Sequence, residues 1–184
     1  MTGPTPTVLM DGAAVRRAVD RMSREIVERL GGTDRLVLMG IQRRGVHLAE
    51  MIAATIDEAE DVSVPRGTLD ITLYRDDLMA VGPKPVVGES KLPPEGVDER
   101  AVVIVDDVLY TGRTARAALN ELMDWGRPAR ILLCVLVDRG SRELPIQPDI
   151  VGRELSVLGH QRIDVHVPEL DGELAVVLEE REAP

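Results

Sequence analysis

The sequence predicts an α/β protein with one mostly parallel sheet flanked by helices, and three observations lead to this prediction. Residues 101–105 form an apolar run without alternating polar residues, which is typical of a parallel strand covered on both faces. Strand-like and helix-like segments alternate along the chain. Two glycine-containing loops each join such a strand to a helix, which is where open α/β sheets bind their ligands.

The expected elements follow one another in a regular order. The first is a helix at residues 13–30, in which Val15, Val19, Met22 and Ile26 gather on one face. The remaining elements are expected as strands at 36–41, 69–74, 101–105 and 131–138, helices at 46–56 and 115–125, and short strands at 163–167 and 174–178. Residues 76–98 are rich in proline, glycine and charge, which predicts a long surface loop that acts as a mobile lid.

Length and composition agree with one intracellular domain. A chain of 184 residues, 44% of them hydrophobic, can bury one core, so we expect a single domain over residues 1–184. The only cysteine, Cys134, lies in an apolar run and is expected to be buried and reduced. No apolar stretch approaches the length of a membrane span, and the N-terminus lacks the pattern of a secretory signal. We therefore expect a cytoplasmic protein without a membrane partner.

The thirteen residues at 102–114, V-V-I-V-D-D-V-L-Y-T-G-R-T, join a strand, two carboxylates and a small hydroxyl-rich loop. Asp106 and Asp107 are expected where the strand emerges, and a helix begins after the loop. Backbone N–H groups near Gly112 and at a helix N-terminus suit a phosphate, whereas carboxylates suit the hydroxyls of a ribose. The motif predicts a sugar-phosphate site; the alternative is that Asp106 merely caps the helix and Thr111 stabilises a turn.

A second loop, G-I-Q-R-R-G at residues 40–45, has the glycine spacing of an ATP-binding P-loop. Val46 and His47 stand where that loop needs Lys and Ser or Thr, so ATP binding is not expected. The loop instead offers Arg43 and Arg44 at the end of a strand, and paired guanidinium groups suit pyrophosphate. Solvated arginines in a plain turn are the alternative.

These segments carry a family resemblance. The 102–114 segment resembles the phosphoribosyl pyrophosphate (PRPP) motif of type I phosphoribosyltransferases, and its V-L-Y-T-G-R-T ending is most similar to the PyrR family of pyrimidine operon regulators. Residues 69–78, 126–128, 135–140 and 142–146 also match that family, and the resemblance extends from about Val8 to about Gly152. It implies a type I phosphoribosyltransferase-like fold and a protein that both forms UMP from uracil and PRPP and binds leader mRNA of pyrimidine genes. It also implies Mg²⁺ with PRPP and a homodimer or higher homo-oligomer.

The resemblance assigns roles residue by residue. Asp106, Asp107 and Arg75 are the expected catalytic residues, with Arg75 closing over pyrophosphate as the lid moves. No protein ligand of Mg²⁺ is assigned. The 5′-phosphate is expected at Val108, Leu109, Tyr110, Thr111, Gly112, Arg113 and Thr114, pyrophosphate at Gln42, Arg43 and Arg44, and uracil at Val137, Asp138 and Arg139. Asp138 and Arg139 could equally form an ion pair that stiffens the turn.

Arginines on the outer face of the first helix suggest an RNA contact. Arg17, Arg21 and Arg24 fall opposite the apolar face, and the family places RNA contacts there and near Arg142 and Arg153. A solvated helix face is the alternative. The formal net charge of −10 disfavours nonspecific RNA binding, and the chain departs from the family pattern at Asp20, Ser141, Gln147 and Glu154.

Three functions therefore remain open from the sequence: a uracil phosphoribosyltransferase, an RNA-binding regulator that senses nucleotide through its PRPP site, and a phosphoribosyltransferase for another base. A metal-centred mechanism is not expected, because His47, His160 and His166 have no spacing that pairs them with Cys or with each other.

Overall fold

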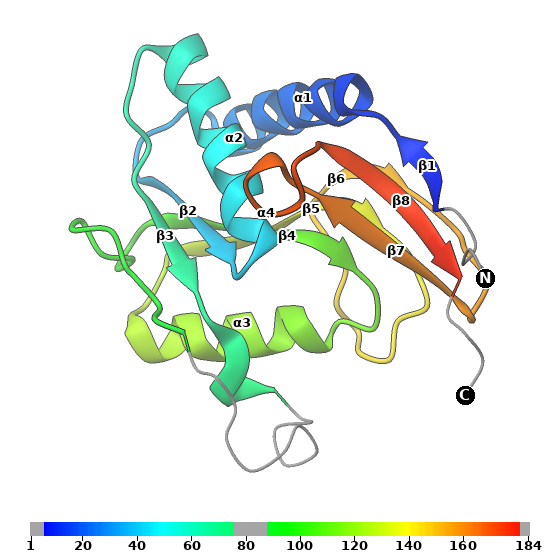
Figure 1. The fold of residues 1–184 in the computed structure, drawn as a ribbon. Coiled ribbons are helices and arrows are strands. Elements are labelled where there is room, and N and C mark those ends of the chain that lie inside the picture. Colours follow the sequence, from blue (N-terminus) through cyan, green and yellow to red (C-terminus); the bar gives the residue numbers. More distant parts are fainter. Residues whose placement is uncertain (1–5, 76–87, 181–184) are drawn as a thin grey trace.

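The computed structural model describes residues 6–75 and 88–180, which form two sheets and the helices that cover them (Figure 1). The larger sheet has the strand order β3-β2-β4-β5-β6, and all four neighbouring pairs are parallel. Its strands are β2 (Leu36–Ile41), β3 (Arg66–Leu69), β4 (Ala101–Leu109), β5 (Arg130–Asp138) and β6 (Ile150–Glu154). The parallel α/β fold expected from the sequence is confirmed.

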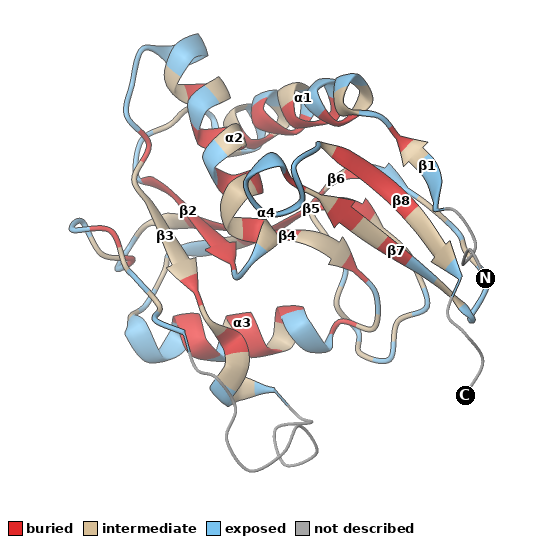
Figure 2. Cartoon of the chain, in the orientation of Figure 1, coloured by how far each residue is buried: buried red, intermediate tan, exposed pale blue. Residues whose placement is uncertain are grey.

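Helices cover both faces of this sheet. The helices α1 (Gly12–Leu30) and α2 (Arg44–Glu60) pack on one face, and α3 (Arg113–Trp125) packs on the other (Figure 1). Successive residues of β2 alternate between the two faces: Leu36 and Leu38 join the core under α1 and α2, whereas Val37 and Met39 join the core over α3. The continuous apolar strands in the sequence thus reflect a sheet buried on both sides (Figure 2).

A smaller antiparallel sheet joins the two ends of the described chain. Its strand order is β1-β8-β7, with β1 (Thr7–Met10), β7 (Gln161–His166) and β8 (Ala175–Glu180). The short helix α4 (Pro168–Asp171) connects β7 to β8. The sequence predicted the last two strands, but it did not predict β1 or β6.

The prediction of a strand at residues 69–74 is wrong. The strand β3 ends at Leu69, and residues Ile71–Tyr74 form a short 3₁₀ helix, η1. The carboxylate of Asp70 accepts hydrogen bonds from the Thr72 N–H and from the Thr72 hydroxyl. This local cap turns the chain away from the sheet, and the apolar residues that suggested a strand instead reach α3 from the turn.

The strand β4 is longer than the predicted 101–105 segment. Asp106, Val108 and Leu109 continue the ladder with β5, opposite Val135, Val137 and Asp138 respectively. The two aspartates therefore lie inside the strand rather than just beyond it, because backbone pairing with β5 continues past the apolar run.

Other predictions are confirmed or fall outside the described residues. Val15, Val19, Met22 and Ile26 are buried on one face of α1, and Cys134 is a buried free thiol. Of the predicted loop at 76–98, residues 76–87 lie outside the described part. Residues 88–98 are irregular and form one bridge between Thr68 and Lys91. Within residues 6–75 and 88–180, no helix has the length and apolar character needed to cross a membrane.

Candidate active site

The loop between β4 and α3 presents the start of a helix. Gly112 is the residue before α3 and has φ 91° and ψ −5°, a left-handed conformation that glycine adopts without the strain of a Cβ atom. Gly112 itself has no side chain that could cap the helix. The hydroxyl of Thr111 accepts a long hydrogen bond from the Arg113 N–H at 3.4 Å. This arrangement suits a bound phosphate.

Asp106 and Asp107 lie side by side immediately before this loop. Asp106 is 6% exposed, and its carboxylate accepts the Asp107 N–H at 2.9 Å. The carboxylate of Asp107 accepts the Val108 N–H at 2.8 Å. Burial raises the pKa of both carboxyl groups, and repulsion from Asp107 adds to the rise at Asp106. The Val108 N–H and the charge of Arg44 partly offset the rise in pKa at Asp107.

The loop between β2 and α2 approaches β4 closely. A Cβ atom on Gly45 would lie 2.5 Å from the Val105 carbonyl oxygen, so only glycine permits this packing. The peptide bond between Gln42 and Arg43 is cis. The Gln42 side chain donates to the Glu89 carbonyl at 3.0 Å, and Arg43 is exposed.

A cleft of about 460 Å³ joins these parts of the chain. It brings together sequence-predicted residues from both loops and from the end of η1: Gln42, Arg43, Arg44, Arg75, Asp106, Asp107, Val108 and Thr114. It does not include Leu109 through Arg113 or the predicted uracil residues. Its other lining residues are Ile41, Asp70, Ile71, Thr72 and Arg162. The cleft therefore carries both arginines and carboxylates, as a ligand with phosphates and hydroxyls requires.

The segment leading to Arg75 is attached to α3. The Tyr74 hydroxyl donates to Asp124 at 2.7 Å, and Arg116 donates to the Tyr74 carbonyl at 3.0 Å. The hydrogen bond to Asp124 raises the pKa of Tyr74 to about 12. These contacts fix the backbone just before Arg75, which lines the cleft.

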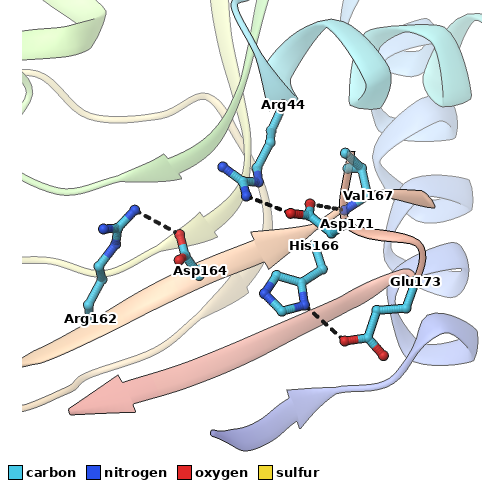
Figure 3. Close-up of polar contacts among 7 residues, drawn as sticks. All are labelled: Arg44, Arg162, Asp164, His166, Val167, Asp171 and Glu173. Carbon is cyan, nitrogen blue, oxygen red and sulfur yellow. Dashed lines mark hydrogen bonds and ion pairs between the residues drawn. The ribbon is translucent and has the colours of Figure 1, made fainter. Parts of the chain in front are cut away.

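The smaller sheet contributes an arginine that sequence reasoning missed. Arg162 on β7 lines the cleft and pairs with Asp164 at 3.0 Å (Figure 3). The alternation of buried Ile163 and Val165 with polar neighbours was a usable signal for the face of the strand. It could not show that this face meets the PRPP-like motif.

Arg44 is held by the segment that connects β7 to β8 (Figure 3). Its guanidinium pairs with Asp171 at 2.9 Å, and the second oxygen of Asp171 accepts the Val167 N–H at 2.9 Å. Partial burial opposes ionisation of Asp171, but the Val167 N–H and Arg44 outweigh this effect and lower its pKa. The pair connects the predicted pyrophosphate loop to α4.

The predicted uracil segment spans the end of β5, at Val137 and Asp138, and the first residue after it, Arg139. The alternative ion pair between Asp138 and Arg139 is wrong: Asp138 pairs with Arg142 at 2.7 Å, and Arg139 lies 3.9 Å above the ring of Tyr110. The other oxygen of Asp138 accepts the Gly140 N–H at 2.8 Å. Asp138 thus pairs with the arginine four residues later in the chain, and Arg139 stacks on the Tyr110 ring instead of pairing with its neighbour Asp138.

The predicted RNA-binding arginines differ in their surroundings. Arg17 and Arg24 are exposed on α1. Arg21 donates to the Gly152 carbonyl, and Arg153 donates to the Leu9 carbonyl at 2.9 Å. The guanidinium of Arg142 is hydrogen-bonded inside its own loop. The structure thus brings no single open patch together from all of them.

Comparison with known proteins defines the class. The sequence model described as "Phosphoribosyl transferase domain" matches residues 8–169. The structure is similar to the hypoxanthine phosphoribosyltransferase of Trypanosoma cruzi, with a TM-score of 0.71, 16% identity, and coverage of 96% of this chain and 97% of that chain. For the Staphylococcus aureus enzyme the TM-score is 0.67, the identity 18% and the coverage 96% and 92%. The protein is a phosphoribosyl transferase with the type I fold.

More similar relatives define the family. A "Bifunctional protein PyrR" from Herpetosiphon aurantiacus is 56% identical over 167 residues, which cover 91% of this chain and 93% of the relative. Another from Thermus thermophilus is 53% identical over 174 residues, which cover 95% and 96%. This chain belongs to the PyrR family.

Proposed function

We propose that this protein forms UMP and pyrophosphate from uracil and PRPP, and that it regulates pyrimidine genes by binding their leader mRNA in response to UMP. The observation that carries the enzymatic part is the single cleft shared by the aspartate pair, the start of α3 and the arginines after β2. The family name, bifunctional PyrR, supports the pairing of two activities.

The cleft suits transfer of a ribosyl group. The start of α3 would hold the 5′-phosphate, and Asp106 and Asp107 would accept hydrogen bonds from the ribose hydroxyls. Arg43, Arg44 and Arg75 would bind the pyrophosphate that leaves C1 as a uracil nitrogen attacks. Catalysis would rest on positioning and charge stabilisation, without a covalent bond to the protein.

Magnesium would enter this site with PRPP. Within the described residues, no three His, Cys, Asp or Glu side chains gather closely enough to hold a metal ion by themselves. The cleft nevertheless offers the oxygens of Asp106 and Asp107, the hard ligands that Mg²⁺ prefers. When bound, Mg²⁺ would neutralise charge on the diphosphate.

A direct assay separates the proposed enzyme from one that uses another base. Purified protein is mixed with PRPP, Mg²⁺ and either uracil, hypoxanthine or guanine, and nucleotide formation is followed by chromatography. We expect UMP from uracil and little product from the purines. Turnover of a purine without turnover of uracil would refute the proposed substrate.

RNA binding is proposed at the exposed face of α1, because Arg17 and Arg24 are both exposed there. Binding to a pyrimidine-gene leader RNA should tighten with UMP and weaken with salt. The double variant Arg17→Glu and Arg24→Glu should bind at least tenfold more weakly, whereas Arg127→Gln, at an exposed site outside this face, should bind like the wild type. Unchanged affinity in the double variant would exclude this face.

The proposal extends to the domain organisation, the location and the oligomeric state of the protein. We propose that residues 1–184 form one phosphoribosyltransferase domain, with a lid at about 76–98, that acts in the cytoplasm as a homodimer or higher homo-oligomer. The match over residues 8–169 supports one domain. Light scattering of the purified chain would measure the oligomeric state.

A further inference from the structure

The loop after β5 packs against residues 110–112, the loop between β4 and α3 where the 5′-phosphate is proposed to bind. Residues 110–112 are called the phosphate loop. The Thr111 carbonyl accepts N–H groups of Glu143 at 2.9 Å and Leu144 at 3.1 Å. A Cβ atom built on Gly112 would lie 3.4 Å from the Cβ atoms of Leu144 and Ile146. The position of the phosphate loop thus depends on the fold of residues 139–146.

Arg142 connects the two loops through one guanidinium group. Its Nη1 donates to the Tyr110 carbonyl in the phosphate loop at 2.9 Å and to the Gly140 carbonyl at 3.3 Å. Its Nε donates to the Ile146 carbonyl at 2.8 Å, and its Nη2 donates to the Asp138 carboxylate at 2.7 Å. A planar fork with donors in several directions is needed to reach all of these oxygens at once.

Burial and charge distinguish Arg142 from an arginine that faces an anion in solvent. Its side chain is 12% exposed, and that of Asp138 is 15% exposed. The Asp138 carboxylate cancels the charge of Arg142 locally, and a shielded pair of this kind resists screening by salt. An RNA phosphate would have to displace these contacts before it could bind here.

We infer that Arg142 is a positioning residue, which holds the phosphate loop at Tyr110 in register with the turn at residues 138–140. This inference rests on the proposed function in placing a sugar phosphate at this loop. It gives Arg142 a role in the substrate site in addition to the RNA contact expected from the sequence.

Two small ligands separate local positioning from general structural damage. Ribose 5-phosphate probes the phosphate loop, and inorganic pyrophosphate probes the loop at Gln42, Arg43 and Arg44. Calorimetry with Arg142→Gln should show a roughly ten- to hundredfold loss of affinity for ribose 5-phosphate, since charge-assisted hydrogen bonds supporting the loop are removed. Affinity for pyrophosphate should stay within about twofold of wild type, because the loop at Gln42, Arg43 and Arg44 follows β2, whereas Arg142 connects the loops after β4 and β5.

Two further variants complete the test. Arg142→Lys keeps the charge but has no planar fork, so it should lose nearly as much affinity for ribose 5-phosphate. Arg29→Gln removes an exposed arginine that pairs with Glu25 on α1, and it should match the wild type with both ligands.

The inference is overturned if Arg142→Gln binds ribose 5-phosphate like the wild type, or if both ligands are lost equally. Because ribose 5-phosphate contains no base, this result does not depend on which base the enzyme uses. A wild-type protein that fails to convert uracil would refute the proposed function and leave the positioning test intact.

Discussion

The Asp106→Asn substitution tests the role of the buried aspartates through activity and stability together. Asp106 is 6% exposed, and an asparagine oxygen can still accept the Asp107 N–H. We expect turnover to fall by roughly two orders of magnitude, because a contact to the reacting ribose is weakened in the transition state. We do not expect a matching loss of stability, since the backbone hydrogen bond is retained.

The pH dependence of stability gives the second measurement. Burial and the neighbouring Asp107 raise the pKa of Asp106, so the folded protein keeps a proton that the unfolded chain releases near pH ~3.9. Wild-type stability therefore decreases as pH rises from about 4 toward the folded-state pKa, at about 1.4 kcal/mol for each unit of elevation. Asparagine does not titrate, so the variant should lack this contribution, and its stability should decrease less than that of the wild type as pH rises from about 4 to 8.

The assay combines urea unfolding between about pH 4 and 8 with steady-state formation of UMP. Asp34→Asn, at an exposed position, is the control and should change neither quantity. Unchanged turnover in Asp106→Asn would refute the ribose role. A stability that declines with pH as steeply as in the wild type would refute the argument from burial.

Three further predictions follow from single contacts. Gly112→Ala should lower the melting temperature by a few degrees and weaken ribose 5-phosphate binding, because alanine at φ 91° costs about 1 to 2 kcal/mol; wild-type behaviour in calorimetry and thermal unfolding would contradict this. Asp171→Asn should cost about 1 kcal/mol at neutral pH, since it weakens the link to Arg44. The pKa of Asp171 is lowered in the folded protein, so its contribution to stability is present above the pKa of the unfolded state and is lost as pH falls through the pKa of the folded state. A stability difference between Asp171→Asn and the wild type that is equal at every pH would contradict this. Burial raises the pKa of the Cys134 thiol, so iodoacetamide at pH ~8 should modify it only in denaturant, and rapid modification of the folded protein would show that the thiol is accessible.

Local sequence patterns were sufficient where each residue's neighbours along the chain decided its structure. The apolar run before Asp106 predicted a strand buried on both faces, and the spacing of Val15, Val19 and Met22 predicted the buried face of α1. The same patterns failed at residues 69–74, where the Asp70 cap outweighed the strand-like composition. They also missed β1, whose partner β8 lies at the other end of the chain, and the short strand β6, which pairs with the preceding strand β5.

The sequence by itself determined the α/β class and the place of both glycine-containing loops between a strand and a helix, because strand periodicity, glycine and paired charged residues are local properties. Only the tertiary structure decided that Arg162 reaches the cleft, that Asp171 holds Arg44, and that Arg142 donates to the Tyr110 carbonyl. Each of these contacts depends on how strands and loops far apart in the chain are brought together, and on burial that no short segment specifies.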